Sequence, residues 1–180
     1  AGGATERLRA QYYDAVTSLL EECWFEPLYE WHEAHDLLRS HDNFGRLSLA
    51  KQTHQYGDYF RTMRWYQAPG YDDGNIDPKA IETRHEIPVG ERNFFDARLA
   101  ASVAAAYDRE RVWGELLHST GWGYPPEDHL AAVVENVCYG MDLYDKHGLY
   151  YSTKGGWWEH APPDTHFRQP YWEHVEGLND

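Results

Sequence analysis

The sequence predicts an α/β protein of the TIM-type (β/α) barrel class, and three observations lead to this prediction. Short strand-like segments lie near Leu37, Tyr71, Val112 and Leu143. Each is followed by helical or loop sequence, an alternation typical of parallel strands with helices outside. A closed eight-stranded barrel takes about 250 residues, whereas this chain has 180. We therefore expect about four β/α units, which amount to a half barrel with long aromatic loops.

The chain length also bears on domain organisation. It suffices for one domain with a sizeable core but not for two large ones. We expect residues 1–180 to form a single (β/α) unit, the C-terminal half of a larger barrel. Such a half would either associate with itself or pair with a missing N-terminal barrel half.

Composition limits the classes of partner. Thirty acidic residues against sixteen basic ones give a formal net charge of −14, which argues against nucleic acid or an anionic membrane as a partner. No run of about 18 apolar residues exists that could span a membrane. Aromatic residues make up 16% of the chain, and many lie near glycines and prolines in its second half. Aromatic rings in loops suit stacking against sugar rings.

The first unit begins with a helix. Leu8, Tyr12, Ala15 and Leu19 recur in steps of three and four, which predicts a long amphipathic helix from Glu6 onward. Pro27 is expected to kink or restart this helix. A short strand around residues 36–40 should follow and place His41 and Asp42 at its C-terminal end.

The second unit contains a helix at residues 55–67, opened by Asp58, and a very short strand from Tyr71. Asp72 and Asp73 then lie at the end of this strand. Because Asp-Gly is a strong turn signal, turn formation is the alternative role for these acids.

The third unit ends in the carboxylate that interests us most. An alanine-rich helix from Asn93 leads into Val112 and Trp113, and Glu115 follows directly. In (β/α) architectures the C-terminal ends of strands hold the catalytic groups, which makes Glu115 a catalytic candidate. The alternative is a structural carboxylate paired with a nearby arginine or backbone amide.

The last unit starts at Pro125 and Pro126, which open a helix that Gly140 should end. Its expected buried face consists of Leu130, Val133, Val134, Val137 and Cys138. The strand-like segment at residues 141–152 ends in His147, Tyr150 and Tyr151. Both cysteines, Cys23 and Cys138, are expected to be buried free thiols.

The histidines do not form a convincing metal motif. His32 and His35 are three residues apart, whereas the zinc helix needs a spacing of four with a glutamate after the first histidine. We therefore expect no metal and no cofactor.

Several segments resemble a known family. The segments SVAAAYDRERVWGE, PPEDHL, YDKHGLYYST and APPDTHFRQPYW are similar to the C-terminal half of the catalytic barrel of large bacterial glycoside hydrolases. The group that includes glycoside hydrolase family 106, the α-L-rhamnosidases, and its uncharacterised relatives is the nearest in pattern. GDYFRTMRWYQAPGYDD and the strand ending in His41 resemble the two preceding units. Relatives carry acidic residues shortly after this histidine, whereas the present chain reads Asp-Asn-Phe-Gly from Asp42.

The resemblance implies a polysaccharide-degrading glycosidase that acts on an oligosaccharide or glycoside. Glu115 would be one catalytic carboxylate, with Asp42 or Asp72 as the second. An extracytoplasmic or periplasmic location would follow. The residues expected to bind sugar are His41, Asp72, His118, Trp122, His147, Tyr150, Tyr151 and Trp157. The alternatives are a non-catalytic carbohydrate-binding protein that uses the aromatic loops and, less favoured, a metal-dependent hydrolase.

Overall fold

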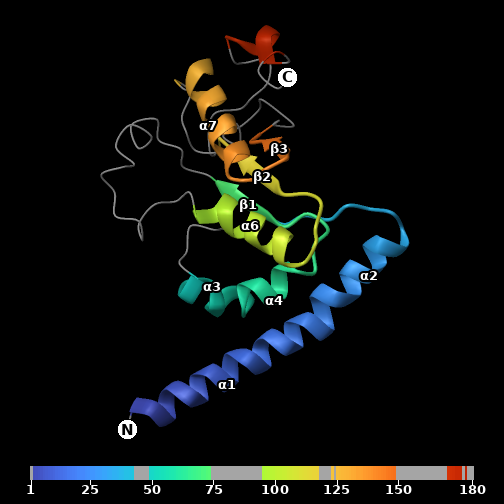
Figure 1. Ribbon diagram of the computed structural model, residues 1–180, viewed down its shortest axis with the longest axis vertical. Coiled ribbons are helices and arrows are strands. Elements are labelled where there is room, and N and C mark those ends of the chain that lie inside the picture. The colour runs from blue at the N-terminus through green and yellow to red at the C-terminus, as the bar shows by residue number, and fades with distance from the viewer. Residues whose placement is uncertain are drawn as a thin grey trace, which may run out of the picture.

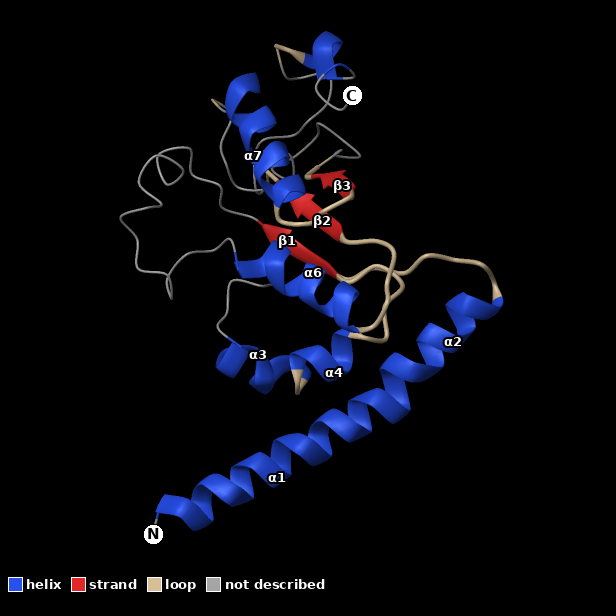
Figure 2. Ribbon diagram, viewed as in Figure 1, coloured by secondary structure: helices blue, strands red, loops and turns tan. Residues whose placement is uncertain are grey.

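The computed structural model describes residues 2–42, 49–73, 95–117, 125–148 and 170–175, together with Gly123 and Gly177. These residues form a mostly helical molecule around one small parallel sheet (Figures 1 and 2). A short 3₁₀-helix, η5 (Trp172–His174), lies near the C-terminus. Among the described helices, none combines the length and the apolar character needed to cross a membrane.

The N-terminal segment is a long helical rod, as the sequence predicts. It consists of α1 (Gly2–Leu20), a π-helix η1 (Glu21–Phe25) and α2 (Glu26–Ala34), which follow one another without a break. Pro27 is the second residue of α2 and does not break the rod, although it removes one helical hydrogen bond because α2 continues η1. Figure 1 shows the rod lying apart from the sheet, with α3 (Leu49–Tyr56) and α4 (Tyr59–Met63) between them.

A line of inward-facing side chains fixes the rod to α4. The Thr17 hydroxyl accepts a hydrogen bond of 2.9 Å from the Asp58 backbone N–H. Glu21 is buried, and its carboxylate accepts hydrogen bonds from Arg61 and Trp65 and forms an ion pair with Arg64. Asp58 in turn caps α4, because its side chain accepts from the Arg61 N–H at 3.0 Å. The predicted helix opening at Asp58 is thus confirmed. The predicted bounds of 55–67 are wrong, because residues 55 and 56 belong to α3 and α4 ends at Met63.

The sheet has three parallel strands in the order β1 (Gly70–Asp73), β2 (Trp113–Leu116) and β3 (Leu143–Lys146). Three of the four predicted strand positions are therefore occupied by strands. The predicted half barrel of four β/α units is wrong, because the described residues form a small open sheet in a mostly helical molecule.

The missing fourth strand was expected just before His41. Residues 37–42 form no strand; the backbone oxygen of Arg39 accepts from the Ala68 N–H at 3.2 Å. The segment nevertheless runs beside β1, because a Cβ on Gly70 would lie only 2.5 Å from the His41 carbonyl oxygen. Glycine at position 70 permits this close approach.

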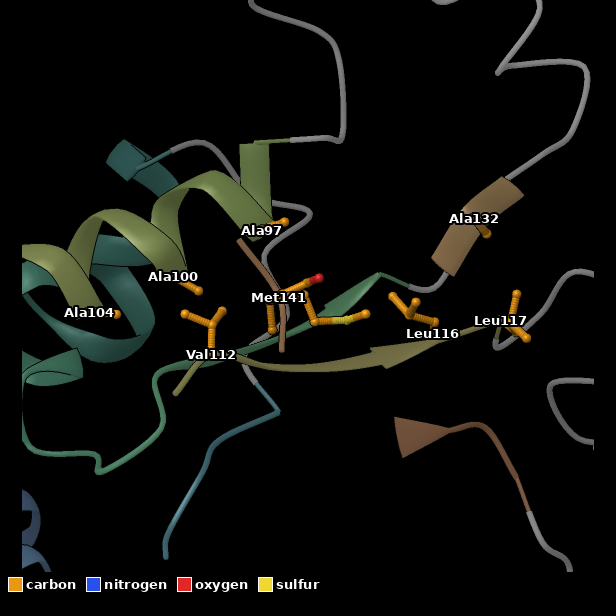
Figure 3. Packing of buried hydrophobic residues seen from close by; sticks show 9 residues of the cluster. Ala97, Ala100, Ala104, Val112, Leu116, Leu117, Ala132 and Met141 are labelled. Atoms are coloured by element: carbon orange, nitrogen blue, oxygen red, sulfur yellow. The ribbon is translucent and has the colours of Figure 1, made fainter. Parts of the chain in front are cut away.

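Two helices cover one face of the sheet. Strands β1 and β2 are joined through α6 (Phe95–Ala106), and β2 and β3 through α7 (Pro126–Cys138). The Tyr71 hydroxyl donates to Asn136 Oδ1 of α7 at 2.8 Å. Figure 3 shows the packing of this core, which contains Tyr71, Ala97, Ala100, Ala104, Val112, Leu116, Leu117, Ala132 and Met141. A second cluster joins η1, α4 and α6 through Phe25, Tyr59, Met63, Tyr66, Leu99 and Val103.

Two predictions about side-chain burial are wrong. In α7 the buried positions are His129, Ala132 and Asn136, whereas Leu130, Val134 and Val137 are 47, 51 and 52% exposed. The helix therefore turns its smaller and polar side to the sheet, where Tyr71 and Tyr144 supply hydrogen-bonding hydroxyls. Both cysteines are free, as expected, but they are exposed.

Candidate active site

The three strands bring acidic side chains into one row. The in-register pairs are Asp72 with Glu115 and Glu115 with Asp145. Neighbours in register on parallel strands point to the same face of a sheet. The residues that precede them, Tyr71 and Tyr144, contact α7. Because side chains alternate along a strand, the three acids lie on the face opposite this helix.

A fourth carboxylate completes the group. Asp42, at the end of the segment 37–42, contributes an oxygen that lies within 4.8 Å of one oxygen each from Asp72 and Glu115, which are equally close to each other. Asp72 is 3% exposed, Glu115 is partly buried and Asp42 is exposed. The cluster therefore has a buried member and an exposed member, with Glu115 between these extremes.

His147 holds Glu115 in place. Its Nδ1 lies 2.7 Å from Glu115 Oε1, and the side chains are 22 and 19% exposed. An ionised carboxylate only accepts hydrogen bonds, so Nδ1 donates in this contact. The His147 backbone N–H also donates to the Leu116 carbonyl at 3.0 Å, which fixes the residue beyond the end of β3. His147 thus orients the carboxylate that the sequence singles out.

Asp145 is a site residue that the sequence reasoning missed. Burial raises the pKa of its carboxyl, and the negative charge of Glu115 raises it further, while His147 acts in the opposite direction. A repeated pattern could have revealed it: in each strand the acid is the third residue, in GYDD, WGEL and LYDK. Comparing the strands with one another, rather than one at a time, would have exposed the row.

His41, the residue before Asp42, packs against two tyrosines. Its ring makes edge contacts with the rings of Tyr56 and Tyr66, with centroids 5.4 and 5.2 Å away. Burial, with a smaller effect from Arg39, lowers the His41 pKa to about 4, so the ring is neutral near pH 7. The pKa of Tyr56 is raised, mainly by burial and also by the charge of Asp42. Tyr56 is therefore a second site neighbour that the sequence reasoning missed.

The backbone turns sharply just after Glu115. Leu117 is fully buried and has a φ of 78°, a left-handed conformation that is uncommon for residues other than glycine. Such conformations persist only where the surrounding packing enforces them, and they cluster at functional sites. This unusual conformation, two residues after Glu115, is a further feature typical of a functional site.

The remaining expected sugar-binding residues lie outside the described part of the chain. This group consists of His118, Trp122, Tyr150, Tyr151 and Trp157. Of the expected set, the structure brings together Asp42, Asp72, Glu115 and His147. His41 directly precedes Asp42 in the chain.

The same carboxylates have the chemistry of a cation site. Asp42, Asp72 and Glu115 can each offer one oxygen to a shared ion. Carboxylate oxygens are the ligands that magnesium, calcium and manganese prefer. The arrangement is thus capable of two kinds of chemistry, proton transfer between carboxyl groups and binding of a divalent cation.

Comparisons of the chain with protein-family models, curated proteins and solved structures found no match.

Proposed function

We propose that the chain is a glycoside hydrolase, or the part of one that carries its carboxylates, and that Glu115 belongs to the catalytic pair. The observation that carries this proposal is the acid cluster at the ends of the strands, where oxygens of Asp42, Asp72 and Glu115 lie within 4.8 Å of one another. Cleavage of a glycosidic bond needs two carboxyl groups that flank it, one as acid and one as base or nucleophile.

Burial favours Asp42 over Asp72 as the partner of Glu115. Asp72 is 3% exposed and is the most buried member of the cluster, whereas Asp42 is exposed and can reach a bound sugar. Glu115, which His147 orients, acts as base or nucleophile in this scheme, and Asp42 protonates the departing oxygen. Asp72 has no direct role in the reaction in this scheme and lies close to both residues.

The substrate class follows from the family resemblance and from the aromatic content. A neutral oligosaccharide or glycoside suits a chain of net charge −14, which would repel an acidic polymer. The resemblance to large bacterial polysaccharide-degrading enzymes adds an extracytoplasmic or periplasmic location to the proposal.

The test is the Glu115→Gln variant, assayed against a panel of aryl glycosides. We expect turnover to fall about 100- to 10,000-fold, because the amide keeps the shape but cannot act as a base. Glu110→Gln is a matched control, since Glu110 is exposed and precedes β2. An unchanged rate in Glu115→Gln would sink the catalytic assignment. Sugar binding without turnover in the unaltered protein would favour a carbohydrate-binding protein instead.

A second candidate function is a metal-dependent hydrolase, and the third carboxylate favours it. A glycosidase pair needs only two acids, whereas a cation prefers several oxygens. Metal content after exhaustive chelation, with activity measured alongside, separates the two functions. An activity that disappears on chelation and returns with a divalent cation would support the metal-dependent function, and an indifferent activity would end it.

A further inference from the structure

The helical rod of residues 2–34 carries large side chains on two sides. Thr17, Glu21 and Phe25 are buried against the body of the molecule. Another set of large apolar side chains remains mostly exposed. Its members, which we call the outer stripe, are Leu8, Tyr12, Leu19, Trp24 and Trp31, with exposed fractions of 67, 62, 59, 57 and 51%.

Spacing places the outer stripe on one line along the rod. Leu8, Tyr12 and Leu19 are separated by steps of four and seven, and Trp24 and Trp31 by seven, each close to one or two helical turns. The π-helix η1 lies between the two groups, and its wider turn brings the tryptophans toward the side of the leucines. Single exposed apolar residues are common, but a contiguous patch of them marks an interaction surface. This side of the rod therefore has the character of a surface that another element covers.

The area is enough for a specific contact. A large aromatic side chain buries about 150–250 Å² when it is covered. With roughly half of each side chain available, the five give on the order of 500 Å² for one chain. Two such stripes together give about 1,000 Å², close to the lower end of the range for stable interfaces.

The charges of the rod are divided unevenly between its halves. Residues 2–18 contain two arginines, Arg7 and Arg9, against two acids. Residues 19–34 contain no lysine or arginine, and their acids are Glu21, Glu22, Glu26, Glu30 and Glu33. Two rods packed in parallel would bring both acidic halves together. Packed antiparallel, each acidic half lies beside the half that contains the arginines.

We propose that the outer stripe is a self-association surface on which a second copy of this chain packs antiparallel. A twofold axis near Leu19 makes the contact self-complementary, as closed dimers require. Leu8 then lies against Trp31 of the second copy, Ala15 against its Trp24, and Arg7 lies on the same side of the contact as its Glu30.

A groove on the rod fits this arrangement. It is open, has a volume of about 670 Å³ and is lined by Leu8, Arg9, Tyr12, Tyr13 and His54. Trp31 of the second copy enters it, because the antiparallel register brings this ring to Leu8. The guanidinium of Arg9, which lines the groove, can stack on the indole face of this tryptophan.

The first test measures mass in solution for the full chain by light scattering and sedimentation. The unaltered protein should have twice the 21.0 kDa mass of the chain. Leu19→Glu and Trp24→Glu should each yield the mass of a single chain with unchanged circular dichroism. Leu130→Glu is the matched control, because Leu130 is a 47% exposed apolar residue on α7. A single-chain mass for the unaltered protein at about 100 µM, well above Kd values of specific dimers, overturns the proposal. So does dissociation by the control alone.

The second test addresses orientation by charge exchange. Arg7→Glu and Glu30→Arg should each weaken association severalfold, and the double variant should restore it, because the exchanged charges meet again across the axis. Losses that simply add in the double variant would overturn the antiparallel register.

Discussion

Asp145 and Glu115 form the electrostatic centre of the candidate site. They are register partners on adjacent strands, and the charge of Glu115 contributes to the raised pKa of Asp145. The Glu115→Gln variant removes this charge, so we expect the Asp145 pKa to move down toward its ordinary value. Carbon-13 NMR titration of the aspartate carboxyls measures this shift without any substrate. Glu110→Gln should leave it unchanged, and an immobile Asp145 pKa in Glu115→Gln would contradict the row of interacting acids.

Glu21 is the residue on which attachment of the rod depends. It is 6% exposed and is met by Arg61 Nε at 3.0 Å, Arg64 at 2.9 Å and Trp65 Nε1 at 3.1 Å. Removing one partner of a buried ion pair leaves charges without compensation and costs about 3–5 kcal/mol. We discount this to about 2–4 kcal/mol for Glu21→Ala, because both arginines are about one-third exposed to solvent.

Urea unfolding measures the effect of Glu21→Ala on the free energy of unfolding. Glu22→Ala is the neighbouring control, since Glu22 is exposed, and should change that free energy by less than about 0.5 kcal/mol. Equal losses in the two variants would refute the anchoring role.

At the scale of elements, Gly114 sets how closely β2 packs. A Cβ at this position would lie 2.7 Å from both Met141 Sδ and the Tyr71 hydroxyl. We expect Gly114→Ala to destabilise the fold by about 1–3 kcal/mol, the usual cost of overfilling a packed core. The variant should also reduce activity, because the adjacent Glu115 shifts with the strand. Thermal unfolding and the glycoside assay measure these effects, and wild-type values in both would show that the strand accommodates the methyl group.

The approximate positions of most helices and strands were predictable from the sequence, but which side of a helix is buried was not. Capping and helix-breaking residues such as Asp58, Pro126 and Gly140 act locally, so these helix ends followed. The helix predicted over residues 55–67 did not, because α3 ends at Tyr56 and α4 at Met63. The buried face of α7 was wrong because apolar periodicity identifies an apolar side without saying what it packs against. Here Tyr71 and Tyr144 demand hydrogen-bonding partners, so Asn136 and His129 face the sheet instead of Leu130 and Val134.

At the scale of the whole molecule, stability should depend on pH through two histidines. The pKa values of His41 and His129 are both lowered to about 4, chiefly by burial. The folded state therefore takes up protons less readily than the unfolded chain, whose histidines titrate near pH 6.5. This contribution to stability is complete above about pH 6.5 and is lost as the pH falls from there to 4.

The fully buried His129 should contribute a slope of up to about 1.4 kcal/mol per pH unit within this window. Urea unfolding at several pH values measures the slope. His129→Gln should flatten it, and His35→Gln, at an exposed position, should not. A slope that is the same in His129→Gln as in the unaltered protein would contradict the assignment to His129.

The candidate site was predicted better than the fold around it. Glu115, Asp42 and Asp72 were expected at strand ends from their local sequence, and the structure brings them together. Asp145 and the partnership of Glu115 with His147 depend on the register between strands, which no single segment encodes. The predicted number of strands was wrong because residues 37–42 lie against Gly70 of β1 without forming a strand.

The π-helix η1 gives the rod a property that neither of its flanking helices has. A π-turn holds one more residue than an α-turn, which rotates everything after it by about 100° relative to an uninterrupted helix. In an uninterrupted helix Trp31 would lie on the side of the buried Thr17, not on the side of Leu8 and Leu19. Residues 21–25 therefore change the direction in which the side chains of α2 point relative to those of α1. Loss of a single residue from this segment would turn Trp31 away from the line of Leu8 and Leu19 and leave the helix otherwise intact.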